Sequence, residues 1–133
     1  MSNSQLPTNE HLFLMRGTHW AGSLSPAETQ RVMTDFYAWA DRLRETGLLR
    51  GAQPLMEEGR LVSGAMGAAV TDGVFIESKE AIAGYFLLSV ASTEEAVRIA
   101  QACPTLAYGM QIEVRPVADV CKVMGDVKAA ALD

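Results

Sequence analysis

Two short runs of the chain are apolar at nearly every position, odd and even alike. Residues 12–15 read Leu-Phe-Leu-Met, and residues 85–90 read Tyr-Phe-Leu-Leu-Ser-Val. Because successive side chains of a strand point to opposite faces of a sheet, each run presents apolar groups to both faces. Soluble monomers rarely leave such a surface in water. The sequence therefore predicts a sheet that is covered on both faces.

Two segments carry the signals of amphipathic helices. The first begins at Ser25, where Glu28 completes a capping box, and it ends at Gly47. The second follows Ser92 with the same capping-box spacing and ends before Pro104. Apolar residues recur at three- and four-residue spacing in the first segment, which is typical of a helix that packs on a sheet.

The order of elements predicts an α+β, ferredoxin-like βαββαβ fold with an antiparallel sheet. Short extended pieces at residues 48–55, 60–64 and 67–71 lie between the first helix and the strand that starts at Tyr85. A last strand at residues 110–117 alternates cleanly between apolar and polar side chains. Both helices are expected on one sheet face. We expect a second copy of the chain on the other face, in a two-fold homodimer that resembles a barrel.

Length and composition limit the classes of protein that fit. The chain has 133 residues, enough for one domain, and its formal net charge of −5 argues against a nucleic-acid partner. The two cysteines show no metal-ligand spacing, so we expect no metal and no cofactor. Neither a signal peptide nor a membrane-spanning segment is indicated, and a cytoplasmic protein is expected. We predict a disordered segment at residues 1–10, a domain at 11–117 and a tail at 118–133.

Polar side chains near the open face are the candidate binding groups. Glu113 and Arg115 alternate with the apolar side chains of the last strand, so they are expected to face the dimer. They would either surround a ligand or form a structural ion pair. Arg16 and His19 follow the first strand, and a loop at a strand end often holds functional residues. His19 could transfer a proton near neutral pH, or be an ordinary surface histidine.

Asp72 is the other candidate for acid/base chemistry. It precedes Gly73 at a strand end, and the apolar Phe75 beside it would raise the pKa of its carboxyl group toward the range of a general base. The alternative is a simple turn in which the Asp72 side chain bonds nearby backbone amides. Tyr85 could contact a flat substrate or complete the core. Cys103 has no base near it in the sequence and is interpreted as a packing residue.

The stretches VTDGVFIESKEAIAGYFLL and CPTLAYGMQIEVRPV resemble the DGPF group of the YCII-related family. The resemblance implies a ferredoxin-like domain assembled as a dimeric α+β barrel. Some relatives look like small-molecule enzymes, and DGPF genes often lie beside alternative sigma factors. Val74 stands where the motif has proline. The His–Asp dyad of enzyme-like members is absent, because the first helix has no histidine and Cys103 precedes Pro104.

Together these features predict a homodimer with a small-molecule pocket in each protomer. Its candidate catalytic residues are Asp72 and His19, and its candidate substrate-binding residues are Arg16, Phe75, Tyr85, Glu113 and Arg115. Whether a reaction is catalysed is left open. The alternative is a non-catalytic regulatory or interaction module, linked to an alternative sigma factor, whose tail from Ala118 onward docks a protein.

Overall fold

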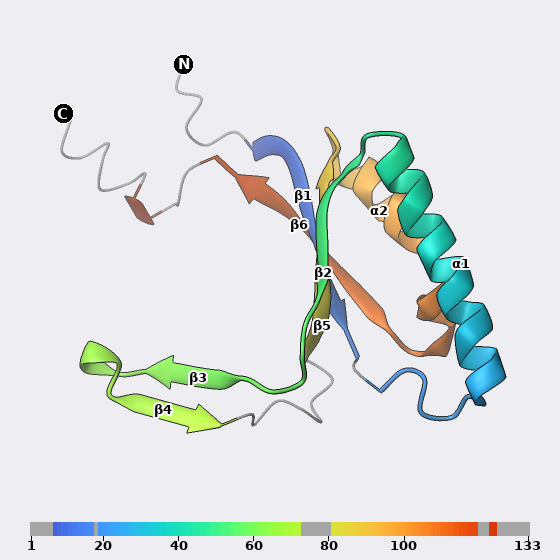
Figure 1. Ribbon diagram of the computed structural model, residues 1–133. Coiled ribbons are helices and arrows are strands. Elements are labelled where there is room, and N and C mark those ends of the chain that lie inside the picture. The colour runs from blue at the N-terminus through green and yellow to red at the C-terminus, as the bar shows by residue number, and fades with distance from the viewer. Residues whose placement is uncertain (1–6, 18, 73–80, 120–122, 125–133) are drawn as a thin grey trace, which may run out of the picture.

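The computed structural model describes residues 7–17, 19–72, 81–119 and 123–124. Within these residues a four-stranded antiparallel sheet has the order β2-β5-β1-β6. Its strands are β1 (Pro7–Arg16), β2 (Leu49–Pro54), β5 (Ile82–Ser89) and β6 (Gln111–Ala118). Helices α1 (Pro26–Glu45) and α2 (Thr93–Gln101) lie on the same face of the sheet (Figure 1). The expected α+β architecture is confirmed, and it fits a ferredoxin-like fold.

Both helices begin as their sequences predict. The Ser25 hydroxyl accepts a hydrogen bond from the backbone N–H of Glu28, whose carboxylate accepts one from the Ser25 backbone. At the start of α2 the Ser92 hydroxyl accepts from the Glu95 backbone N–H. Gly47, just after α1, has a φ of 79°, a conformation that glycine adopts at low cost. These local signals fix where each helix starts and where α1 stops.

The core lies between the helices and one face of the sheet. Phe13 and Met15 of β1 and Phe86 and Leu88 of β5 point toward the helices and are buried. Their neighbours Leu12, Leu14, Tyr85 and Leu87 point to the opposite face and are half-buried. In the register, Leu12 pairs with Leu87 and Leu14 with Tyr85. The two-sided apolar character predicted for both strands is therefore present. Among the residues that the structure describes, no other element covers the outer face of the sheet (Figure 1).

His11 ties β1 to the start of α2. It is only 2% exposed, with Nδ1 3.2 Å from the carbonyl oxygen of Val90 and Nε2 3.1 Å from the hydroxyl of Thr93. A carbonyl only accepts, so Nδ1 carries the proton and donates it. β1 begins at Pro7, before the apolar run of residues 12–15 that indicated the strand.

The chain between β2 and β5 forms a separate hairpin. Strands β3 (Arg60–Ser63) and β4 (Ala69–Asp72) pair with each other and not with the main sheet, and the short 3-10 turn η1 (Ala65–Gly67) joins them. The hairpin extends away from the helices, on the open side of the sheet (Figure 1). The sequence predicted these extended pieces but not that they pair with each other. The exposed apolar side chains of the hairpin are Leu61, Val62, Met66 and Val70.

Gly84 lets β2 approach β5 closely. A Cβ atom at this position would lie 2.8 Å from the carbonyl oxygen of Gln53 and 3.2 Å from Cα of Pro54, and both contacts are to backbone. We expect Gly84→Ala to lower the free energy of unfolding by about 1–3 kcal/mol, because the strands must move apart. Gly51→Ala on β2 is the matched control, since nothing lies within 4 Å of its added Cβ. Chemical denaturation of both variants tests this, and equal stability would contradict it.

Candidate functional site

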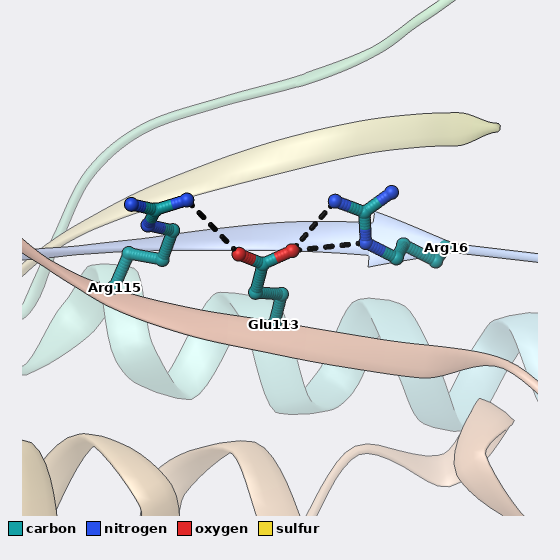
Figure 2. Close-up of polar contacts among 3 residues, drawn as sticks. All are labelled: Arg16, Glu113 and Arg115. Atoms are coloured by element: carbon teal, nitrogen blue, oxygen red, sulfur yellow. Dashed lines mark hydrogen bonds and ion pairs between the residues drawn. The ribbon is translucent and has the colours of Figure 1, made fainter. Parts of the chain in front are cut away.

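Three charged side chains form an ion group on the open face of the sheet. Glu113 of β6 accepts hydrogen bonds from Arg16 of β1, at 3.0 Å from Nε and 2.6 Å from Nη2. Its other carboxylate oxygen accepts from Nη1 of Arg115 at 3.2 Å. Figure 2 shows the carboxylate between the two guanidinium groups, on the side of the sheet away from the helices. The sequence placed Glu113 and Arg115 on this face, and the structure adds Arg16 to them.

The ion group borders the apolar part of the open face. Glu113 pairs across the strands with Leu14, which in turn pairs with Tyr85. The hydrogen bonds from Arg16, with smaller contributions from the charges of both arginines, lower the pKa of the Glu113 carboxyl group. The carboxylate is therefore charged at neutral pH and lies between two guanidinium groups. Such a group can orient an anion or fix a partner sheet.

The lowered pKa of Glu113 predicts a pH-dependent contribution to stability. A carboxyl group with a depressed folded-state pKa stabilises the fold above its ordinary value of 4.5, and this contribution is lost as the pH falls through the depressed value. We expect Glu113→Gln to remove the part of the acid destabilisation that the wild type shows as the pH falls from 4.5 through the depressed pKa. Thermal melts from about pH 7 to about pH 3 measure it. Glu57→Gln, at an exposed loop position, is the control and should melt as the wild type does at every pH. Identical changes in the two variants would contradict the role given to Glu113.

A cleft of about 330 Å³, called the cavity below, lies between α1 and the sheet and is partly open to solvent, with the exposed residues Tyr37, Arg44, Gln53 and Pro54 among its lining. One wall comes from α1 and the other from β1, β2 and β5, with further residues from the segments after β1 and α2. Its described lining is Met15, Trp20, Met33, Phe36, Tyr37, Ala40, Arg44, Ala52, Gln53, Pro54, Ala83, Gly84, Tyr85, Phe86, Thr105 and Met110. This is the volume of a small-molecule site, and the lining is mostly apolar, as such sites usually are.

The cavity explains an irregularity on the inner face of α1. Trp39 and Ala40 are buried there, whereas Met33 and Phe36, on the same face, are only half-buried. Phe36 still contacts Phe86 across the gap, with ring centroids 5.8 Å apart. Met33 and Phe36 therefore continue the apolar face of the helix but line a space that core side chains do not fill.

Thr105 is a buried polar residue among those that line the cavity. It lies in the 3-10 turn η2 (Pro104–Tyr108), is 1% exposed, and donates to the Met110 sulfur at 3.0 Å. Since its only hydrogen goes to Met110, the 3.1 Å contact with Cys103 Sγ has the thiol as donor. Burial raises the pKa of the Cys103 thiol, so it remains protonated at neutral pH and is a poor nucleophile.

The predicted site residues do not gather in one place. Arg16, Glu113 and Arg115 form the ion group on the open face. The Tyr85 side chain points to the same face, although Tyr85 is also among the residues that line the cavity. His19 is exposed in the turn after β1, next to the cavity residue Trp20. Asp72 ends β4 on the hairpin, where its backbone pairs with Arg60. Phe75 lies outside the described residues.

Sequence analysis missed most of the cavity. The sequence pattern placed three of the lining residues on apolar core faces, namely Met15, Met33 and Met110, and it gave no indication for Thr105. The one available signal was the density of methionines and aromatics on faces directed at the helices, but periodicity alone does not separate a filled core from a cavity. In the described part of the chain, no group of three or more His, Cys, Asp or Glu side chains is arranged to hold a metal ion.

The cavity and the ion group lie on opposite faces of one small α+β domain. None of the helices in the part of the chain that the structure describes is long and apolar enough to cross a membrane. A comparison with curated proteins gave no match. The family model of the YCII-related domain matches residues 12–120, which span β1 to the end of β6, and the chain therefore belongs to the YCII-related family.

Proposed function

We propose that this YCII-related protein binds a small, largely apolar organic molecule in the cavity beneath α1. The observation that carries the proposal is a mostly apolar space of about 330 Å³ between α1 and the sheet, partly open to solvent. A ligand that covers these half-exposed apolar walls removes them from water, which is favourable. Apolar walls with one or two polar groups are the usual make-up of a ligand site.

Proton transfer at this site would come from groups at its border. Of the lining residues that the structure describes, none is an Asp, Glu or His. His19 directly precedes Trp20, which lines the cavity, and it is the better supported of the two proposed catalytic residues. Asp72 is the second, from the hairpin. Binding is thus the primary proposal, and acid/base chemistry on the bound molecule is an extension of it.

The open face is proposed to pack against a second copy. Leu12, Leu14, Tyr85 and Leu87 form an apolar strip across β1 and β5 that is only half-buried in one chain. An isologous pairing of two such sheets would cover the strip and place the Arg16–Glu113–Arg115 group inside the interface. This assembly is the dimeric α+β barrel expected from the resemblance to the DGPF group.

Filling the cavity tests the proposal directly. Ala40 is buried on the inner face of α1 and lines the cavity, whereas Ala38 is exposed on the outer face of the same helix. Protein purified from its own host and measured by native mass spectrometry should retain a small molecule. We expect Ala40→Phe to abolish retention and Ala38→Phe to preserve it.

A second filling variant, Ala52→Leu on the opposite wall, guards against a folding defect at Ala40. Retention by both filling variants would contradict the proposal, as would a wild type that carries no small molecule. The latter result would favour the interaction module instead, for which the exposed apolar side chains of the β3–β4 hairpin are the supporting observation.

A further inference from the structure

The β3–β4 hairpin is exposed and uncharged over most of its length. Every residue from Gln53 to Thr71 is exposed in the single chain, and no charged side chain lies between residues 61 and 71, although charged residues make up 20% of the protein. Met66, in the turn at the tip, is fully exposed, and Val62 is 62% exposed. Natural proteins usually protect free strand edges with charged side chains or proline. An exposed apolar hairpin without this protection indicates a surface that another molecule covers.

The hairpin carries apolar side chains on both of its faces. Val62 lies opposite Val70 on one face, and Leu61 lies opposite Thr71 on the other. A strand pair that rests on one surface is typically apolar on one face only. In the part of the chain that the structure describes, β3 and β4 pair only with each other, and a two-stranded hairpin alone is at best marginally stable in water. This pattern indicates an arm that another protein surrounds, rather than a flap on its own domain.

The hairpin stands on the same side of the sheet as the apolar strip of Leu12, Leu14, Tyr85 and Leu87 (Figure 1). It follows β2, an edge strand, so it lies at the border of the open face. Each of its strands has four residues and is about 13 Å long, whereas two sheets packed face to face lie about 10 Å apart. A second copy seated on the strip would therefore lie within reach of the hairpin.

We propose that the β3–β4 hairpin is a dimerisation arm, which extends past the open-face interface and packs its apolar side chains against the second copy. This inference rests on the proposed homodimer, because the arm needs a partner on the open face. It adds a contact outside the strip and the ion group. Two-fold symmetry makes this contact reciprocal, so one assembly covers the strip and the arm of both chains.

Photo-cross-linking from the tip of the arm tests which chain it contacts. Met66→p-benzoylphenylalanine places the photoreactive group in the turn, and light and heavy isotope-labelled chains are mixed in equal amounts before irradiation. We expect adducts that join a light peptide to a heavy one, identified by mass spectrometry. Ala38→p-benzoylphenylalanine, on the exposed side of α1, is the control and should give no such adducts. Adducts confined to single chains would overturn the inference, as would adducts to a different protein in irradiated cells.

A charge on the arm should weaken the dimer. We expect Val62→Asp to raise the dimer dissociation constant at least about tenfold, because the new carboxylate would lie unpaired in the contact. Ala38→Asp should leave the constant unchanged, and analytical ultracentrifugation measures both. Under conditions where all the proteins are monomeric, the melting temperature of Val62→Asp should equal that of the wild type, since the hairpin pairs outside the main sheet.

The outcomes separate the arm from the proposals on which it rests. If Leu14→Glu, on the strip, dissociates the dimer and Val62→Asp does not, the open-face interface stands and the arm is overturned. A monomeric wild type overturns both, while retention of a host molecule in the Ala40 experiment still decides ligand binding in the cavity.

Discussion

Leu14→Glu is expected to convert the proposed homodimer to a monomer. Leu14 lies at the centre of the open face, paired with Tyr85 on one side and Glu113 on the other. A glutamate there would place a new carboxylate beside Glu113 and bury it against the partner, and two-fold symmetry would repeat the defect in the same interface. The dimer dissociation constant should rise by at least about a hundredfold. Analytical ultracentrifugation over a concentration series measures it.

The control for this variant carries the same change on another surface. Ala38→Glu adds a carboxylate to the exposed side of α1 and should leave the dissociation constant unchanged. The thermal stability of Leu14→Glu under conditions where both proteins are monomeric shows whether the fold itself is intact. A wild type that sediments as a monomer would contradict the open-face interface, as would a Leu14→Glu variant that still dimerises.

Trp39→Ala should cause the largest loss of fold stability. The Trp39 ring stacks on Phe86 with centroids 5.2 Å apart and an interplanar angle of 20°, and its Nε1 donates to the carbonyl of Ile99 at 3.2 Å. It thereby joins α1 to β5 and to α2. Truncating a buried tryptophan costs about 3–5 kcal/mol, which lowers the melting temperature of a domain of this size by about 10–20 °C. Calorimetry gives both values.

Trp20 provides the comparison within the same protein. It is only half-buried, it borders the cavity, and its ring contact is with Tyr108, at 6.3 Å and a tilted angle. Trp20→Ala should therefore destabilise the fold clearly less than Trp39→Ala. Equal losses in the two variants would mean that the stacked cluster around Trp39 is not the centre of the core.

The sequence predicted the elements that rest on local signals. Ser25, Ser92 and Gly47 fix helix ends through hydrogen bonds and backbone conformations that involve only neighbouring residues, so pattern reasoning found them. The alternation of residues 110–117 likewise placed Glu113 and Arg115 on the correct face. These inferences need no knowledge of what lies across the sheet.

The features that sequence reasoning missed depend on distances between remote segments. Strands β3 and β4 pair with each other in a separate two-stranded sheet, and no local pattern in the sequence encodes that choice of partner. The cavity exists because Met33 and Phe36 do not fill the space above Met15 and Phe86. Whether apolar side chains fill a volume depends on three-dimensional packing, which periodicity does not report.

The most direct test of the cavity is to observe which methionines respond to a ligand. The chain has seven methionines, and Met15, Met33 and Met110 line the cavity, whereas Met56, Met66 and Met124 are exposed elsewhere. Methyl-labelled methionine in an NMR screen against small, largely apolar fragments reports each position separately. We predict that binding fragments shift the signals of Met15, Met33 and Met110 and leave the exposed three unchanged. Shifts confined to the exposed methionines, or none from the whole fragment set, would contradict the cavity as the binding site.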